Sequence, residues 1–417
     1  MIRQNFNADW TVEKGDGNSR MNSFLGNTQT KTVHLPYDAM IHEARTPDTK
    51  NGAQTGFYPG GEYIFQKHFT APQAWQGKPV SLVFEGVYQT ALVYLNGWLL
   101  TRNVNGYAEF TVEAGPYLKY GADNLLKVIA DNSLEPNSRW YTGSGIYRPV
   151  RLLVGNKVYL PQDTVRITTR EADEGFALLD VTAQVQSAST VTERVTLQQT
   201  ICREGTAVLT DRQNLLLQPG ESRTVSFRYC VDSPALWSPE NPNLYTSTMQ
   251  VLEGEEELDR EETGFGIRTL SIDAAHGVRI NGQTVKLRGA CIHHDNGILG
   301  AATLPDAEER RIRQLKEAGF NAIRSSHHPA GRALLDACDR YGVLVMDELS
   351  DVWNVRKNPY DYALYFEQDW KPTIQKMVAK DYNHPSVILY CVGNEISEAG
   401  SESGAETNRR LCNTFRE

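Results

Sequence analysis

The 417 residues are enough for roughly two to four domains, each with a core of its own. Charged residues make up 22% and apolar residues 40% of the chain, which is typical of globular enzymes and excludes a disordered protein. The net charge is −9 and Lys and Arg are not clustered, so nucleic acid is not an expected partner.

The chain carries no sign of a membrane or secretory protein. No apolar run approaches the roughly 20 residues that cross a bilayer, and the first residues lack the basic, apolar and small-residue order of a secretory signal. The six cysteines are scattered, without a close pair that would suggest zinc or redox chemistry. We therefore expect a cytoplasmic protein with reduced cysteines and no membrane partner.

Residues 1–155 are predicted to form a β-sandwich. They are rich in Gly, Tyr and Trp, and short apolar runs are broken by turns with almost no helical periodicity. In residues 91–100, apolar segments flank Asn96-Gly97, the pair that best tolerates positive φ at both central positions of a hairpin turn. A hairpin is expected there.

Residues 156–268 show a cleaner alternation of apolar and polar residues. Two runs carry it, and their apolar members are Leu179, Val181, Ala183 and Val185, then Val225, Phe227, Tyr229 and Val231. About 110 residues of such strands favour an immunoglobulin-like sandwich. We interpret this domain as a spacer.

In residues 269–417 the period changes, and strand-like runs alternate with amphipathic helices. Asp306 and Glu309 form a capping-box pattern, and Gly319 can end that helix in a left-handed conformation. Further runs follow in order: a strand at 321–324, a helix up to Gly342, a strand at 343–346, a helix around 374–378 and a strand at 387–392.

This alternation implies a parallel sheet covered by helices, either an open doubly wound sheet or a (β/α)8 barrel. About four βα units fit before Glu417, which is half a barrel. Both architectures place function at the carboxyl ends of the strands.

Polar and titratable residues follow each of these strands. They are His293, His294 and Asp295, then Arg324, Ser325, Ser326, His327 and His328, then Asp347 and Glu348, and last Asn394 and Glu395. A single residue of this kind is usually a cap or a satisfied surface group. Four sets in register predict an active site.

Glu395 is the candidate acid of this site. It directly follows a buried strand, so its carboxyl group is expected to be partly desolvated and its pKa raised, which suits a general acid. The amide of Asn394 beside it can hydrogen-bond a sugar hydroxyl as the transition state forms.

The motifs resemble those of glycoside hydrolase family 2, and most of all its β-galactosidases. In the last third they are LRGACIHHDNG (287–297), NAIRSSHHP (321–329), VMDE (345–348) and DYNHPSVILYCVGNE (381–395) followed by IS. Earlier they are FEGVYQTALVYLNG (84–97), RWYTGSGIYRPVRL (139–152), LWSPENPNLY (236–245) and GFGIR (264–268). The resemblance implies a sugar-binding jelly roll, an immunoglobulin-like domain and the first half of a catalytic TIM barrel.

The family hydrolyses glycosides with retention, using two glutamates about 5 Å apart. The resemblance implies that Glu395 is the acid/base and Asn394 its partner for the sugar 2-hydroxyl. It further implies that His294 and His327 contact the sugar, and Asp295 is expected to line the same site. His328 stands where the family has tyrosine, so its role is open.

Two further points follow from the resemblance. Arg324 either holds nearby carboxylates at the substrate site or is purely structural. Val352 and Asn354 occupy positions where some members bind magnesium; because valine cannot coordinate a cation, neither a metal nor another cofactor is expected.

The family's nucleophile belongs to the second half of the barrel, beyond Glu417, so this chain alone is expected to be inactive. Glu348 is a poor substitute, because the family keeps a structural residue there. The predicted function is hydrolysis of terminal β-galactosides. The alternatives are a β-glucuronidase or β-galacturonidase of the same family, and a non-catalytic carbohydrate-binding fragment. A homo-oligomer is compatible with all of them.

Overall fold

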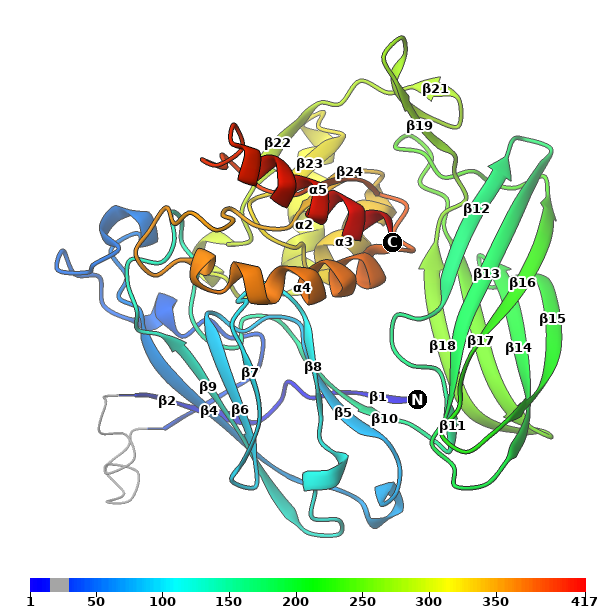
Figure 1. The fold of residues 1–417 in the computed structure, drawn as a ribbon, viewed down its shortest axis with the longest axis horizontal. Helices are drawn as coiled ribbons and strands as arrows, with labels where there is room; N and C mark the ends of the chain where they lie inside the picture. The colour runs from blue at the N-terminus through cyan, green and yellow to red at the C-terminus, as the bar shows by residue number, and fades with distance from the viewer. Residues whose placement is uncertain (16–29) are drawn as a thin grey trace.

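The protein is seen in a computed structural model that describes residues 1–15 and 30–417. Its first domain is a jelly-roll sandwich of two antiparallel sheets, drawn in blue and cyan in Figure 1. One sheet has the strand order β1 (Ile2–Asn5), β10 (Val150–Val154), β5 (Val80–Phe84) and β8 (Phe110–Glu113). The other runs β3 (Lys31–Val33), β2 (Trp10–Lys14), β4 (Gly61–Thr70), β9 (Asp123–Asn132), β6 (Thr90–Leu95) and β7 (Trp98–Asn103).

The jelly-roll core lies between these sheets because successive strand residues point to opposite faces. Trp10, Phe65 and Leu126 are fully buried in it. The predicted hairpin is confirmed: β6 and β7 pair across Asn96 and Gly97, whose φ angles are +52° and +90°. A residue without a Cβ, or an asparagine, tolerates this conformation best.

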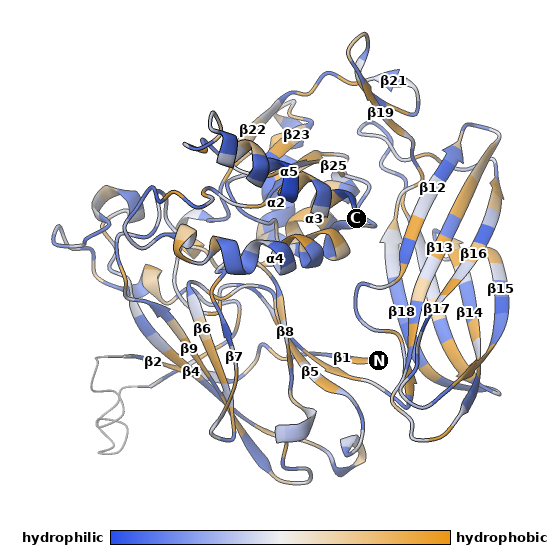
Figure 2. Cartoon of the chain, viewed as in Figure 1, coloured by the Kyte–Doolittle hydropathy of each residue, from blue (hydrophilic) through white to orange (hydrophobic). Residues whose placement is uncertain are grey.

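The second domain is the expected immunoglobulin-like sandwich. Its first sheet runs β11 (Val158–Tyr159), β13 (Phe176–Ser187) and β12 (Arg166–Ala172), with β16 (Ser222–Asp232) also paired to β13. Its second sheet runs β15 (Thr206–Leu217), β14 (Glu193–Arg203), β17 (Tyr245–Glu253) and β18 (Glu256–Phe265). The apolar residues of both alternating runs are buried, and Figure 2 shows the alternation along β13 and β16.

The last third is half of a (β/α)8 barrel, as predicted. A small sheet of β19 (Leu270–Asp273), β20 (Gly277–Ile280) and β21 (Gln283–Thr284) leads into it. The parallel strands are β22 (Gly289–Ile292), β23 (Ala322–Ser325), β24 (Leu344–Glu348) and β25 (Val387–Cys391), adjacent in chain order. The helices that follow them in turn are α2 (Pro305–Glu317), α3 (Arg332–Tyr341), α4 (Phe366–Asp381) and α5 (Glu402–Arg416).

The ends of two helices test the capping predictions. Gly319, expected to end α2 in a left-handed conformation, has φ +90° and directly follows the C-cap residue Ala318. The predicted helix end at Gly342 is confirmed, because Gly342 is the C-cap of α3. The capping box of α2 is wrong, because the helix begins two residues earlier, with Leu304 instead of Asp306 as N-cap and Pro305 in its first turn. Glu309 instead accepts hydrogen bonds from Tyr341 and Arg340 of α3. Proline fixes the φ angle that a first helical turn needs, and this preference sets the boundary.

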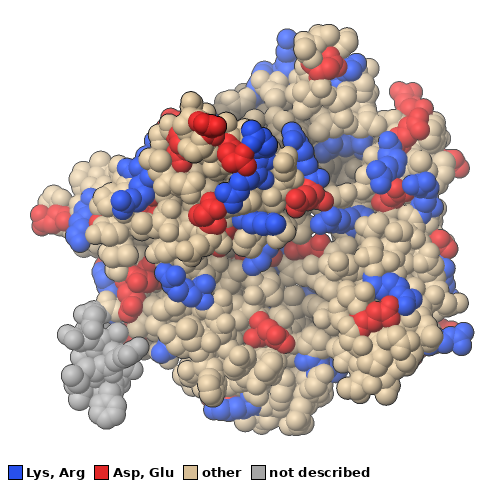
Figure 3. Space-filling view, in the orientation of Figure 1, with Lys and Arg blue, Asp and Glu red and all other residues tan. Residues whose placement is uncertain are grey.

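Two surface features bear on partners. Among the described residues, no helix has both the length and the apolar character that a membrane crossing requires. On the face drawn in Figure 3, basic and acidic side chains are interspersed.

Candidate active site

The parallel sheet brings its four polar strand ends to one edge. Because β22 to β25 are parallel and neighbours, the residues that follow them project from the same end of the sheet. Hydrogen bonds join the predicted residues Arg324 and Asn394 to each other and Arg324 to Glu348, and Glu395 pairs with Arg139, which the sequence did not single out.

Glu348 lies at the centre of the first group of contacts. Its carboxylate, which is fully buried, receives Arg324 Nε at 2.9 Å and Arg324 Nη2 at 2.7 Å. His327 Nδ1 lies 2.9 Å from the same carboxylate. A buried carboxylate needs such paired partners, and both its oxygens are occupied. Arg324 is therefore a residue that holds a carboxylate, one of the two roles left open for it.

Asn394 links this group to a second one. Its Oδ1 accepts from Arg324 Nη2 at 3.3 Å, and its Nδ2 donates to Asp351 Oδ1 at 2.8 Å. Lys357 Nζ donates to Asp351 Oδ1 at 3.0 Å and to the Asn394 carbonyl at 2.7 Å. The amide is thus fixed at both ends, and its orientation is set before any ligand binds.

Arg139 brings the jelly roll into the site. It lies in the segment between β9 and β10, and its guanidinium donates to Asp351 from Nε at 3.0 Å and from Nη2 at 2.6 Å. Its third nitrogen, Nη1, donates to Glu395 Oε2 at 2.8 Å. Burial by itself raises the pKa of Asp351, but hydrogen bonds from Arg139, Asn394 and Lys357 outweigh burial and lower it.

Glu395 differs from the sequence-based expectation. Its side chain is 68% exposed, and the hydrogen bond from Arg139 lowers the pKa of its carboxyl group, whereas burial and a raised pKa were predicted. The reason is local: β25 ends at Cys391, and the backbone turns to φ +44° at Glu395, which directs the side chain away from the buried strand.

The four histidines of the site divide into two pairs. His293 and His327 face each other at 5.7 Å between ring centroids, and both contact Trp140 of the jelly roll, at 4.9 and 5.7 Å. His294 and His328 face each other at 4.9 Å and pack against Tyr107 instead. Each His-His sequence, which lies just after β22 or β23, thus supplies one ring to each side.

The structure places His294, which the resemblance assigned to the sugar, on the buried side of this cluster. Its Nε2 lies 3.0 Å from the Thr142 carbonyl, the residue is 6% exposed, and burial lowers its pKa to about 3. His328 stacks on Tyr107 with centroids 4.0 Å apart, and burial lowers its pKa as well. His294 and His328 are therefore neutral packing residues at the jelly-roll interface. Of the two consecutive histidines 293 and 294, His293 is the one that faces Trp140 and His327.

Asp295 follows His294 in the same loop. Arg311 holds this loop by donating to the carbonyls of His293 at 2.6 Å, His294 at 3.3 Å and Asp295 at 2.5 Å. Within the described chain, the Asp295 side chain is joined neither to the Arg324–Glu348 pair nor to the Arg139–Asp351 pair. The structure thus places Asp295 near the strand ends but outside their network.

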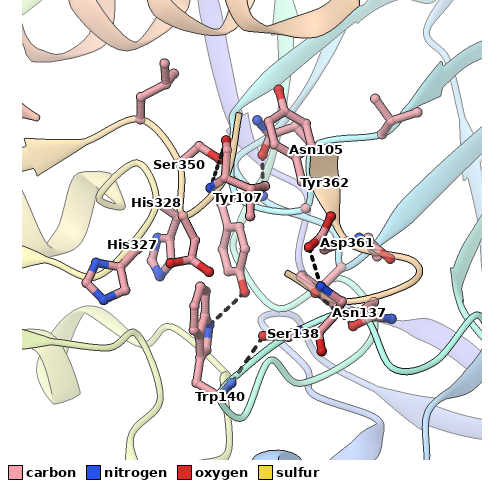
Figure 4. Close-up of a pocket in the computed structure, with 18 residues that line it drawn as sticks. Asn105, Tyr107, Asn137, Ser138, Trp140, His327, His328, Ser350, Asp361 and Tyr362 are labelled. Atoms are coloured by element: carbon pink, nitrogen blue, oxygen red, sulfur yellow. Dashed lines mark hydrogen bonds between the residues drawn. The ribbon is translucent and has the colours of Figure 1, made fainter. Parts of the chain in front are cut away.

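A pocket opens where the jelly roll meets the barrel half (Figure 4). Aromatic, amide and acidic side chains of both domains line it, among them Tyr88, Asn105, Tyr107, Asn137, Trp140, His327, Asp351, Asp361 and Tyr362. Trp140 Nε1 donates to the Tyr107 hydroxyl at 3.0 Å, as Figure 4 shows. A rigid aromatic surface beside polar groups can bind the apolar face and the hydroxyls of a sugar.

Sequence reasoning missed Arg139, Trp140, Tyr107 and Lys357 as site residues. The segment RWYTGSGIYRPVRL resembles a family motif, but the resemblance gave its residues no individual role. An arginine beside a tryptophan in a loop of a β-domain was the available signal.

The structure also bears on metal binding. Val352 is buried and its side chain cannot coordinate a cation, whereas Asn354 is exposed and its backbone N–H donates to Glu398. Within the described residues, Asp336, Asp339 and His384 form a group of potential ligands away from this site. His384 Nδ1 lies 2.5 Å from Asp339, and Ser386 N donates to the same carboxylate, so these groups already have partners.

Comparison with known proteins covers almost the whole chain. Residues 10–176 match the galactose-binding domain-like part of glycosyl hydrolase 2, residues 158–268 match glycosyl hydrolases family 2, and residues 274–414 match its TIM barrel domain. The β-galactosidase BoGH2A of Bacteroides ovatus is 37% identical over 97% of this chain and 48% of its own length. A β-glucuronidase of Bacteroides fragilis is 27% identical over 89% of this chain and 54% of its own.

Solved structures agree. A glycosyl hydrolase family 2 member from Bacteroides cellulosilyticus superposes with a TM-score of 0.95 at 36% identity, covering 100% of this chain and 55% of that one. The β-glucuronidase 2 of Bacteroides uniformis, bound covalently to cyclophellitol-6-carboxylate aziridine, gives 0.82 at 26% identity, covering 100% and 51%. The chain spans about half the length of the curated relatives it matches.

Proposed function

The chain belongs to glycosyl hydrolase family 2, and from this premise we propose that it provides the acid/base half of a retaining β-glycosidase that removes terminal β-galactosides. The observation that carries the proposal is the position of Glu395. Its carboxylate is open to solvent at the carboxyl ends of the parallel strands, beside the fixed amide of Asn394.

In this proposal Glu395 serves twice. As an acid it gives its proton to the glycosidic oxygen while a second carboxylate attacks the anomeric carbon, and as a base it then takes a proton from the water that releases the sugar. Asn394 binds the 2-hydroxyl, and His293, His327 and Trp140 surround the ring. Arg324 supports this surface from the strand ends by holding Glu348 and the Asn394 amide.

We propose that the second carboxylate comes from the part of the relatives' length that this chain does not span. Glu348 is unsuited to the role, because Arg324 and His327 occupy both its oxygens and its side chain is fully buried. On this basis the 417-residue chain alone has no significant hydrolase activity. Its jelly roll and immunoglobulin-like domain should still fold, since each has its own core.

A β-uronide is the second candidate substrate. Arg139 places a cation 2.8 Å from Glu395, and cationic groups bind a uronate carboxylate well. However, two of its three nitrogens are committed to Asp351, which favours a neutral sugar. The similarity to BoGH2A, a β-galactosidase, supports the same choice.

The test uses a full-length protein with aryl β-galactosides and aryl β-glucuronides. Glu395→Ala should lower kcat/KM by about 10²- to 10⁴-fold for a poor leaving group, and azide should restore turnover of an activated substrate. Glu402→Ala, on the exposed start of α5, is the matched control and should act like the parent. Unchanged hydrolysis in Glu395→Ala would refute the assignment.

A further inference from the structure

Arg139 holds a position that the proposed chemistry has not yet used. All three guanidinium nitrogens donate to carboxylates of the barrel half, two of them to Asp351 and one to Glu395. The residue itself belongs to the jelly roll, whose strands end at Asn132 on one side of it and resume at Val150 on the other. The contact therefore crosses a domain boundary.

Asp351 fixes the orientation of this guanidinium. Arg139 binds it with two roughly parallel hydrogen bonds, the geometry in which arginine and carboxylate are most strongly oriented. Asp351 is in turn held by Asn394 and Lys357. With the planar group held on one side, the direction in which Nη1 points is set as well.

Glu395, in contrast, has little else to hold it. Its side chain is 68% exposed, and among the described residues Arg139 is the one cation within ion-pair distance of it. Lys357 Nζ, the nearest alternative in the network, is used by Asp351 and by the Asn394 carbonyl. An exposed glutamate without a partner would sample several rotamers.

We propose that Arg139 is the positioning residue for Glu395, so that the jelly roll determines where the acid/base carboxylate lies and favours its charged form. This inference rests on the proposed function, in which Glu395 is the acid/base. Arg139 need not touch the substrate, because it acts through Glu395.

The expected effect on the pH dependence of activity follows from the positive charge of Arg139 beside Glu395. The hydrogen bond from Arg139 lowers the pKa of Glu395. Protonated Glu395 is required as the acid, so the alkaline limb of kcat/KM lies at lower pH than it would without Arg139. Removal of Arg139 should move this limb to higher pH, and it should slow the second step, which needs the carboxylate.

The experiment compares Arg139→Gln and Arg139→Lys in the full-length enzyme. Arg139→Gln should lower kcat/KM by about tenfold for an aryl glycoside with a poor leaving group and shift the alkaline limb upward. Arg139→Lys retains the charge but cannot span both carboxylates. The alkaline limb of its kcat/KM profile should therefore lie between those of the parent and of Arg139→Gln. The matched control is Arg228→Gln, which removes a two-point pair with Asp180 in the immunoglobulin-like domain. Its limb should not move.

A second readout does not depend on activity. The Glu395 carboxyl can be titrated by NMR in protein labelled with [δ-13C]glutamate, with Glu395→Gln identifying the signal. Arg139→Gln should raise the midpoint of that titration and Arg228→Gln should not. Thermal melting of each variant checks that it is folded, and the milder Arg139→Lys serves if Arg139→Gln does not fold.

The outcomes separate the two proposals. If Glu395→Gln abolishes the alkaline limb but Arg139→Gln moves neither the limb nor the carboxyl titration, the role of Arg139 is refuted and the function stands. If Arg139→Gln moves the titration but not the limb, Glu395 is not the acid, and both proposals are wrong. If Arg139→Gln moves both the alkaline limb and the carboxyl titration, and Arg228→Gln moves neither, the inference is supported.

Discussion

The two sandwiches have similar interiors but contact the barrel half at different ends. The jelly roll reaches the carboxyl ends of the strands, where Arg139, Trp140 and Tyr107 meet Glu395 and the histidines. The immunoglobulin-like domain mainly meets the opposite ends. Its Pro239 carbonyl accepts from Lys316 at 2.6 Å, and its Ile167 N–H donates to Asn383 at 2.9 Å.

These two ends of a barrel have different uses. Lys316 also donates to Gly342, which precedes β24, and Asn383 precedes β25, so the immunoglobulin-like domain supports the amino-terminal side. In barrels of this kind the carboxyl ends carry the active site and the amino ends carry stability. The comparison predicts that jelly-roll changes affect catalysis and that changes in the other sandwich affect stability alone.

The largest expected effect comes from the residue that contacts both sandwiches. Arg332 of α3 donates to Glu109 of the jelly roll at 2.8 Å and pairs with Asp163 of the immunoglobulin-like domain at 2.5 Å. Arg332→Ala leaves Asp163 without its cation and Glu109 with Arg151, both in a partly buried site, and should cost about 3 kcal/mol of unfolding free energy, measured with urea at pH 7. Arg340→Ala, which removes an exposed pair with Glu309, should cost less than about 1 kcal/mol. Equal losses of unfolding free energy in the two variants would contradict the role of Arg332 in linking the two sandwiches to α3.

A smaller effect, on activity, should follow from Trp140→Ala in the full-length enzyme. The change removes the ring that His293 and His327 contact and the hydrogen bond to Tyr107, so kcat/KM should fall about 10²-fold. Leu179→Ala, in the buried core of the other sandwich, should cost about 2 to 5 kcal/mol of stability and leave kcat/KM of the folded enzyme unchanged. A comparable loss of kcat/KM in Leu179→Ala would contradict the prediction that changes in the immunoglobulin-like domain affect stability alone.

The smallest effect concerns pH. Burial lowers the pKa of His294 from 6.5 to about 3, so the unfolded chain binds the proton more tightly than the folded one. Stability should therefore fall as pH drops from about 6.5 toward about 3, by up to about 1.4 kcal/mol per pH unit from this residue. Urea titrations of His294→Gln at pH 7 and pH 4.5 should show a smaller difference than the parent.

Much of the fold could be predicted from the sequence because its signals are local. The Asn96-Gly97 turn, the alternating runs of β13 and β16 and the left-handed Gly319 depend on neighbours within a few residues. The capping box of α2 failed for a similar reason: two local signals competed, and Pro305 determined the start of the helix.

The candidate site was predicted less completely. Family-like motifs led to the strand ends and to Glu395, Asn394, His327 and Arg324, which the structure brings together. They could not indicate which histidine of each His-His sequence contacts Trp140 and which packs on Tyr107, since both aromatic residues come from another domain. The protonation of Glu395 was misjudged for the same reason, because its partner Arg139 is 256 positions away in the chain.

By itself, then, the sequence determined the order of two sandwiches and a βα array, the strand ends that carry polar groups, and the position of the acid/base candidate. These follow from hydrophobic periodicity and turn chemistry, which act over a few residues. Only the tertiary structure decided that Glu395 is exposed and paired, that His294 is buried, and that the jelly roll contributes Arg139. Those properties depend on solvent access and on charges brought close through space, and both arise only when separate domains pack together.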